Sequence, residues 1–518
     1  MFGSKSVEPS FTNLRNNAMN RFLVLIIVVA AAGSSCAAAE KPDVLVILSD
    51  QWSPRYLSWD NPQVRTPNLD RIAHEGMIFD ACYTPASICM PARVSLISGL
   101  YPHDHGHALW TNTLHYCVAR DAAPMFRDIR QAGYTTAQIG KTHWTGGDDW
   151  KKSFQTQDEY FAALGLDHVD DISGPVDSPR DRGLYAQHLR QRGLLGMVAA
   201  DLHNRYIQGE FLARASVVRP DDYHDSVVTR LATEFIRQQP HEKPICLVVS
   251  LHSPHPPLDA PGEFATMYDP QQLTLPDNVP ASMKYDGRTL DHAEVKKVLA
   301  NYLGKTALVD HCVGQLVEAM KARGTWDRAL VVFTSDHGEM MGAHAAFTKG
   351  RFYEESARVP LVIRWPGQIP ANRSQALVQM FDVYPTIVEA VGGKISAGRF
   401  AKSLLPVATG KAPAVRDLVI SEVGNAAPLK IMARDARFKY WAEGEAERLF
   451  DLEKDPLEMH DLANLPEYRD ALDQMRRRLL TYLRSTLVNF GDGYKGKVKT
   501  MREAEGAKDG ARLKRKTK

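Results

Sequence analysis

The sequence is poor in cysteine, nearly neutral in charge, and free of long apolar runs. Only six of its 518 residues are cysteine, and no two of them form a Cys-x-x-Cys pair, which argues against a zinc site built from such pairs. The hydrophobic fraction of 44% and the charged fraction of 24% are ordinary for a globular protein. The composition therefore excludes a largely disordered chain, a coiled coil and a repeat array.

The formal net charge of +2 hides an uneven distribution. Residues 491–518 contain ten Lys or Arg and four Asp or Glu, and residues 1–39 are also net basic. The body between them is therefore net acidic, which argues against a surface for nucleic acid. We expect no nucleic-acid partner, and we interpret residues 491–518 as a basic, disordered tail.

Residues 1–39 are typical of a signal peptide for export. Arg21 precedes an apolar run over residues 22–32, and the small residues after that run suit cleavage. The run is too short for a comfortable membrane span, so we expect none that is stable. The sequence predicts an exported, periplasmic or extracellular protein, with Met19 as an alternative start. An uncleaved anchor and a lipoprotein attached through Cys36 are alternatives.

Short apolar runs alternate with longer stretches of helical character. Such near-continuous apolar strands predict an α/β fold with a large mixed, mostly parallel central sheet flanked by helices. Apolar residues at helical spacing predict an amphipathic helix over residues 301–322. The predicted strands cover residues 44–48, 135–139, 245–251, 330–334 and 361–364.

The pattern changes near residue 413, where short alternating runs predict a small C-terminal α+β subdomain. It consists of a four-stranded antiparallel sheet over residues 418–422, 430–434, 438–441 and 448–452, followed by a helix over residues 466–488. We therefore divide the chain into a catalytic domain over residues 40–412, with a charged insertion at about 150–240 that lacks a sheet signal, and a subdomain over residues 413–490.

Chemically versatile residues follow four of the predicted strands directly. Because ligands bind at the carboxyl ends of strands in an open α/β sheet, these residues indicate one convergent site. A single Asp or His in such a place often has only a structural role, but four such coincidences are improbable together. The four segments are Asp50-Gln51, Gly140-Lys141-Thr142-His143, His252-Ser253-Pro254-His255 and Ser335-Asp336-His337-Gly338.

The residue types at these strand ends favour chemistry on an oxyanion. Asp50, Gln51, Asp336 and His337 offer ligands for one divalent cation in a partly open site. The cations Arg93, Lys141 and Lys349 suit a group whose oxygens gain negative charge during transfer. His143 and His255 can exchange protons near neutral pH.

Cys89 lies close to a signal for the start of a helix. Cys89 lies just before Pro91, and proline favours the first position of a helix. A helix over residues 91–98 would direct its free N–H groups toward an anion held beside Cys89.

At this point the sequence resembles a known family. The segment Cys89-Met90-Pro91-Ala92-Arg93, continuing to Gly99, resembles the signature of the type I sulfatases of the alkaline phosphatase superfamily. Residues 133–143 resemble the second signature of that family, and the resemblance extends from Pro42 to about Leu462.

The resemblance implies a mechanism and a cofactor. A formylglycine-generating enzyme would oxidise Cys89 to Cα-formylglycine, whose hydrate attacks the sulfur of a sulfate ester. Arg93 and Lys141 would hold that hydrate, and Lys349 would contact the sulfate. His255 would protonate the leaving alcohol and His143 would accept the proton from the second hydroxyl. The metal positions would be Asp50, Gln51, Cys89, Asp336 and His337, with Ca²⁺ as the usual ion and Mn²⁺ or Mg²⁺ as alternatives.

Two residues differ from the usual metal ligands of this family, and these differences leave alternative functions open. Gln51 stands where many sulfatases have a second Asp, and His337 is a softer ligand than a typical calcium site uses. Hydrolysis of a sulfate monoester on a sulfated carbohydrate is the leading hypothesis, with a sulfated small molecule as the other substrate class. The alternatives are a phosphonate monoester or phosphodiester hydrolase with the same nucleophile, and a non-catalytic glycan-binding protein if Cys89 stays unmodified.

Overall fold

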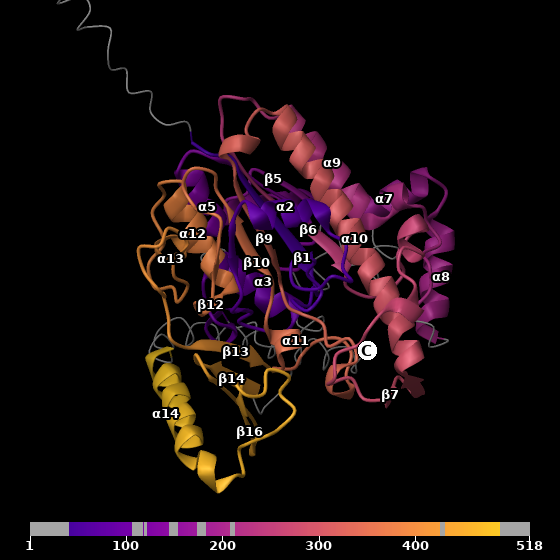
Figure 1. The fold of residues 1–518 in the computed structure, drawn as a ribbon. Coiled ribbons are helices and arrows are strands. Elements are labelled where there is room, and N and C mark those ends of the chain that lie inside the picture. The colour runs from indigo at the N-terminus through magenta and orange to yellow at the C-terminus, as the bar shows by residue number, and fades with distance from the viewer. Residues whose placement is uncertain are drawn as a thin grey trace, which may run out of the picture. The chain divides into compact units, whose positions relative to one another are not determined.

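An eight-stranded sheet lies at the centre of the fold in a computed structural model that describes residues 41–105, 118, 122–144, 154–172, 183–207, 213–424 and 430–486. Its strand order is β11-β2-β10-β9-β1-β6-β4-β5 (Figure 1). In that order the strands are Asn372–Ser374, Met77–Phe79, Leu361–Arg364, Leu330–Ser335, Val44–Asp50, Ile245–Pro254, Thr135–Gly140 and His168–Asp171.

The sheet is mixed but mostly parallel, as the sequence predicts. Strands β9, β1, β6, β4 and β5 run parallel to one another. Strand β10 is antiparallel to both β9 and β2, and β11 is parallel to β2. The carboxyl ends of β1, β4, β6 and β9 therefore meet at one edge of the sheet.

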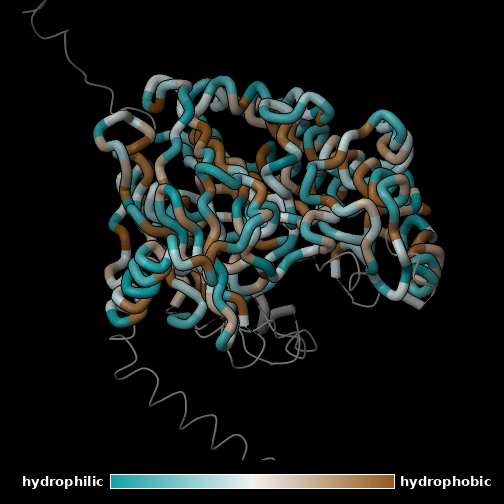
Figure 2. Tube along the Cα trace, turned by 60° about the horizontal axis from the view of Figure 1, so that its bottom comes forward, coloured by the Kyte–Doolittle hydropathy of each residue, from teal (hydrophilic) through white to brown (hydrophobic). Residues whose placement is uncertain are grey.

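Helices cover both faces of the sheet and enclose two apolar cores. Side chains of β1 alternate between the cores: Leu45 and Ile47 pack with α9 and α10, whereas Val46 and Leu48 pack with α3, α5 and α12. Hydrophobic segments run through the interior in Figure 2, and hydrophilic segments are frequent around it. The helices are α2 Pro67–His74, α3 Cys89–Ser98, α4 Pro102–His105, α5 Met125–Gln131, α6 Phe154–Leu164, α7 Leu184–Gln191, α8 Leu195–Ile207, α9 His224–Gln238, α10 His292–Ala322, α11 Glu354–Ala357, α12 Val383–Ala390, α13 Leu405–Ala408 and α14 Arg469–Thr486.

The predicted C-terminal sheet and helix are present. Strands β13 Val419–Val423, β14 Lys430–Arg434, β15 Phe438–Glu443 and β16 Ala446–Asp451 form an antiparallel sheet. Helix α14 packs on one face of this sheet, and Tyr83 and Phe352 pack with Trp441 from the other face. Two small sheets complete the described structure: β3 Cys82–Tyr83 with β12 Val378–Gln379, and β7 Ser282–Tyr285 with β8 Arg288–Asp291.

Several element boundaries differ from the sequence-based expectations. Helix α10 begins at His292 rather than at residue 301, because Asp291 caps it by accepting a hydrogen bond from the N–H of Glu294. Helix α14 begins at Arg469 after a 3₁₀ turn over Pro466–Tyr468. The predicted end of this helix, at residue 488, lies outside the described residues.

The segment 150–240 is more regular than its sequence indicates. It supplies the edge strand β5, and it contains α9, which packs on β4 and β6. Strand β5 has the sequence His-Val-Asp-Asp and its four residues are only partly buried, so it lacks the apolar run that marks the central strands. Strand β5 is therefore one that the sequence pattern does not reveal, and the proposed domain boundaries stay predictions.

The predicted signal peptide over residues 1–39 and the predicted tail over residues 491–518 both lie outside the described residues. Within the described part of the chain, no helix combines the length and the apolar content that a membrane crossing requires.

Candidate active site

Cys89 is the first residue of helix α3, and Ile88, in an extended conformation, precedes it as the cap. The helix therefore begins two residues before Pro91, which a first turn tolerates because its N–H groups have no partner within the helix. Every residue of α3 is buried. The start of a helix carries partial positive charge and free N–H groups, so Cys89 lies where negative charge is favoured.

The carboxyl ends of the four central strands deliver the other predicted residues. Asp50 is the last residue of β1, and Lys141 and His143 follow β4. The loops after β6 and β9 carry His255 and the pair Asp336-His337. Because these strands are neighbours and parallel, their ends place these side chains around Cys89.

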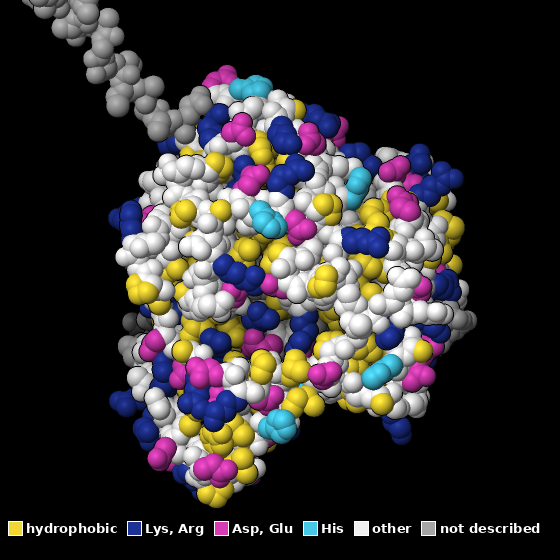
Figure 3. All heavy atoms as spheres, in the orientation of Figure 1, with side chains coloured by type: hydrophobic (Ala, Val, Ile, Leu, Met, Phe, Trp, Pro, Cys, Tyr) yellow, Lys and Arg dark blue, Asp and Glu magenta, His cyan; other side chains and the backbone are white. Residues whose placement is uncertain are grey.

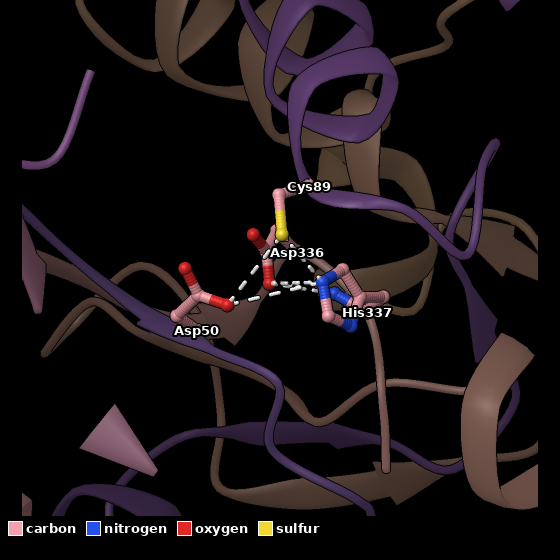
Figure 4. Close-up of side chains that lie close together, drawn as sticks. All are labelled: Asp50, Cys89, Asp336 and His337. Atoms are coloured by element: carbon pink, nitrogen blue, oxygen red, sulfur yellow. Dashed lines mark hydrogen bonds and ion pairs between the residues drawn. The ribbon is translucent and has the colours of Figure 1, made fainter. Parts of the chain in front are cut away.

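Four of these side chains form a compact cluster of potential metal ligands (Figure 4). The Sγ atom of Cys89 lies 3.0 Å from Nε2 of His337 and 3.8 Å from Oδ1 of Asp50. The Nε2 atom of His337 is 3.6 Å from Oδ1 of Asp336. On the other side of the ring, Nδ1 of His337 pairs with the carbonyl of Gly338 at 3.0 Å, which turns Nε2 toward the cluster.

Gln51 borders this cluster, because its backbone N–H donates to Oδ1 of Asp336 at 3.1 Å. Its backbone takes the left-handed conformation, with φ of 68°, immediately after β1. Its side-chain Nε2 donates to buried Glu339, and this contact leaves Oε1 facing Nζ of Lys349 at 2.8 Å. Two carboxylates, an amide oxygen and an imidazole nitrogen fit one divalent cation, so the residues present match the donor set that the sequence predicts.

Two buried cations neutralise the carboxylates. Arg93 donates from Nε to Asp336 at 2.8 Å and approaches Asp50 at 3.2 Å, while Lys141 lies 2.5 Å from Asp50. Arg93 is further fixed by Ser250. Burial alone would raise the pKa of Asp50, but Lys141, His255 and Arg93 together lower it below its usual range. Asp50 is therefore ionised and available as a ligand.

The surroundings of Cys89 are strongly electropositive. Nζ of Lys349 lies 3.0 Å from Sγ. Burial opposes ionisation of the thiol, yet Lys141, Lys349 and His337 outweigh burial and hold the pKa of Cys89 well below its usual value. A position that stabilises a thiolate so strongly also suits the oxygens of a charged ester.

Two histidines contact Cys89 from different strand ends. His143, with φ of 54°, and His255 each hydrogen-bond the Cys89 side chain. Burial lowers the pKa of both imidazoles; Lys141 adds to the effect at His143, and Lys349 brings His255 to about 4. Both rings are therefore neutral near pH 7 and free to exchange protons with a bound group.

The structure thus gathers every residue predicted for the site around Cys89. Sequence reasoning missed three supporting residues, which are Ser250, Lys305 and Glu339. Lys305 has no exposed surface, and its Nζ donates to the carbonyls of His255 at 2.5 Å and Pro257 at 2.8 Å. A lysine on the apolar face of a predicted amphipathic helix is the signal that could have revealed it.

Comparisons with known proteins agree with this geometry. The sulfatase family matches residues 42–393, and the family described as N-sulphoglucosamine sulphohydrolase, C-terminal, matches residues 342–485. An arylsulfatase of Clostridium perfringens is 26% identical over 489 residues, which cover 88% of this chain and 97% of that protein.

Two further relatives differ in their described activities. An ulvan-active sulfatase of Formosa agariphila is 27% identical over 478 residues, covering 88% of this chain and 83% of that protein. The crystal structure of a phosphonate monoester hydrolase of Agrobacterium radiobacter shares the fold, with a TM-score of 0.71 at 24% identity over 86% of this chain and 96% of that one. The chain belongs to the sulfatase family, as a type I sulfatase of the alkaline phosphatase superfamily and a sulfuric ester hydrolase.

Proposed function

We propose that the protein is exported and hydrolyses a sulfate monoester on a sulfated carbohydrate. Its nucleophile is the hydrate of a formylglycine that a formylglycine-generating enzyme makes from Cys89, and one divalent cation, Ca²⁺ in first place, assists it. The observation that carries this proposal is the position of Cys89 at the start of α3, in contact with Lys349, His143 and His255.

In the structure, Sγ of Cys89 stands in for an oxygen of that hydrate. The hydrate supplies two hydroxyls on one carbon: one forms a bond to sulfur while the bond from sulfur to the leaving alcohol breaks, and the other loses its proton as sulfate is expelled and the aldehyde returns. This chemistry needs one group that donates a proton, one that accepts a proton, and cations that balance the sulfate.

The residues around Cys89 can fill these roles. His255 donates a proton to the leaving alcohol, and His143 accepts the proton of the second hydroxyl. Lys349 and Lys141 balance the negative charge that grows on the transferred group, and Arg93 holds the two carboxylates beside it.

The cation would be held by Asp50, Gln51, Asp336 and His337. When bound, it would supply fixed positive charge beside the nucleophile and lower the cost of deprotonating it.

Mass spectrometry of the peptide over residues 82–93 tests the nucleophile. The protein from its native host, or co-expressed with a formylglycine-generating enzyme, is expected to yield a peptide whose Cys89 has become an aldehyde. A Cys89→Ser variant gives the unconverted control and is expected to be inactive. A wholly unconverted and yet active protein from the native host would falsify this mechanism.

A relative, the proposed export and the surface charge support a carbohydrate substrate. The ulvan-active relative matches 88% of the chain, and export would place the enzyme where sulfated polymers occur. Figure 3 shows Lys and Arg side chains beside a hollow above the four-stranded sheet, a surface that suits an anionic substrate. Screening the purified protein against defined sulfated saccharides tests this, and turnover of small aryl sulfates alone contradicts it.

A phosphonate monoester hydrolase is the second candidate. Two observations favour it: the fold is shared with such an enzyme, and Gln51 and His337 make the metal site less negative and softer than two further carboxylates would. Rates on matched aryl sulfate and aryl phosphonate substrates separate the two functions. We expect the sulfate to react faster, and a large preference for the phosphonate overturns the first proposal.

A further inference from the structure

A second cluster of buried, potential metal ligands lies outside the active site. His224 and Asp225 open helix α9, and His252 lies near the end of β6. One potential ligand atom from each of the three residues lies within 4.8 Å of the other two. We propose that His224, Asp225 and His252 bind a transition-metal ion of the Zn²⁺ type, separate from the cation of the active site.

The distances suit direct coordination. Nδ1 of His224 lies 3.1 Å from Oδ2 of Asp225, at the range of an ion pair but without the alignment of a hydrogen bond. Two ligands at ordinary zinc bond lengths in a tetrahedral arrangement are about 3.3 Å apart. The two atoms are therefore already near the separation that an ion between them requires.

The neighbours hold the ligands in a suitable state. Nε2 of His252 pairs with the carbonyl of Ile172 at 3.1 Å, so this nitrogen carries the proton and Nδ1 keeps its lone pair. Oδ1 of Asp225 accepts the backbone N–H of His252 at 2.6 Å, and its Oδ2 accepts the hydroxyl of Ser253. These contacts fix the carboxylate in its charged form and leave one lone pair of Oδ2 for an ion.

Buried nitrogens without a partner point to a missing ligand. Nδ1 of His252 and Nδ1 of His224 have no hydrogen-bond partner among the described residues, although the side chains are 0% and 3% exposed. A buried polar atom without a partner is unfavourable, and an ion bound at these nitrogens would supply the missing partner.

The donor set selects the class of ion. Two imidazole nitrogens and one carboxylate favour Zn²⁺ and similar transition metals over Ca²⁺ and Mg²⁺, which prefer oxygen ligands. Three protein ligands leave one position of a tetrahedral ion for water. The nearby cation Lys305 is balanced by Asp259 at 3.7 Å, so it does not leave an unmatched positive charge beside the site.

An ion at this place would join helix α9 to the end of β6. The loop that follows β6 carries His255, so the ion would act as a structural pin behind the active site rather than as a participant in its chemistry. The inference rests on the three side chains alone and does not depend on conversion of Cys89.

Metal counting with two matched variants tests the proposal. Full-length protein, stripped by a chelator, loaded with Zn²⁺ and desalted, is expected to retain two equivalents. The variants His224→Leu and His337→Leu each lose a different equivalent, so each retains one. In the His337→Leu protein, loading with Co²⁺ is expected to give the visible absorption of a four-coordinate ion, and adding His224→Leu removes that absorption.

Diffraction gives a result that does not depend on the folding of any variant. Crystals of the zinc-loaded, unsubstituted protein are expected to show anomalous density between His224, Asp225 and His252 at the zinc absorption edge. Density at the active site alone, or His224→Leu protein that folds normally and still retains both equivalents, overturns the proposal. Failure of the sulfatase assay leaves these readouts unchanged, so the two proposals stand or fall separately.

Discussion

Nζ of Lys349 lies 3.0 Å from Sγ of Cys89, which brings an ammonium group to the place where the proposed mechanism puts the transferred oxyanion. We predict that Lys349→Met lowers kcat about 10²–10³-fold, because a preorganised donor to the developing charge is lost. Steady-state kinetics on an aryl sulfate measures this. Exposed Arg351→Met makes the same change of charge two residues away, and equal losses in both variants contradict the prediction.

Removal of the cation is expected to abolish activity without unfolding the protein. Asp50 and Asp336 each keep a buried cationic partner when the ion leaves, Lys141 for the first and Arg93 for both. Chelated protein should therefore retain its circular dichroism spectrum, with a lower Tm, and recover activity when Ca²⁺ is added. The Tm falls because a cation present at 100 times its Kd stabilises the folded protein by about 2.7 kcal/mol, and chelation removes this stabilisation. Global unfolding on chelation would show that these ion pairs are insufficient.

Lys305 is expected to act on catalysis through His255. Its buried ammonium donates to the carbonyls of His255 and Pro257, so Lys305→Met releases the loop that aims the imidazole. We predict a loss in kcat of about 10²-fold on an alkyl sulfate, whose alcohol needs a proton to leave. The loss on an activated aryl sulfate should be much smaller. Lys297→Met, an exposed change on the same helix, is the control, and a loss independent of the leaving group indicates a merely structural role.

The pH dependence of the reaction should report His255. Because burial and Lys349 lower its pKa to about 4, the ring is mostly neutral in the free protein near neutral pH. An acid catalyst must carry its proton, so kcat/KM is expected to rise as the pH falls from about 8 to about 5. His255→Gln should remove this limb of the profile. A variant that keeps it shows that another group is the acid.

The lowered pKa of His255 also affects the stability of the protein, which is expected to fall, rather than rise, as the pH is lowered. The unfolded chain takes up the proton near the ordinary histidine pKa of about 6.5, whereas folded His255 resists protonation. Its contribution to stability is therefore complete above about pH 6.5 and is lost as the pH falls toward about 4. Urea unfolding of the protein and of His255→Gln at several pH values measures this contribution.

Lys439 should be essential for attachment of the C-terminal sheet. It has no exposed surface, and its Nζ lies 2.6 Å from Glu354 and 2.8 Å from Glu458. Lys439→Met leaves buried Glu458 without its cation and Glu354 with Arg358 as its remaining ion pair, which costs about 3–5 kcal/mol of unfolding free energy. Denaturant unfolding measures the loss, and adding Glu458→Gln should restore part of it. An unchanged stability would show that the carboxylates find other partners.

The sequence predicted the centre of the fold well, for a physical reason. Strands buried on both faces must be apolar along their whole length, so β1, β4, β6 and β9 stand out as continuous runs. Edge strands have no such requirement. Strand β5 is half polar, and β11 is the three-residue segment Asn-Arg-Ser, so nothing in their composition distinguishes them from loops.

The site could be predicted because its residues follow those apolar strands, but its supports could not. Ser250 lies inside an apolar run, and Glu339 acts through the orientation of Gln51, which no sequence pattern reports. The backbone at Gln51 and His143 is another example. Both are left-handed without being glycine, a conformation that the surrounding contacts impose rather than the residue itself.

The complete burial of helix α3 sets an order of events in the life of the protein. All ten residues of the helix that begins at Cys89 are enclosed by the folded chain, and the proposed converting enzyme would have to hold the peptide around Cys89. A small ester can reach a single side-chain atom at the start of α3, but a second protein cannot bind the backbone of a helix that is buried along its whole length. The proposed oxidation of Cys89 would therefore have to precede folding, so the converting enzyme would compete with folding of the newly made chain, and protein that folds first would stay inactive.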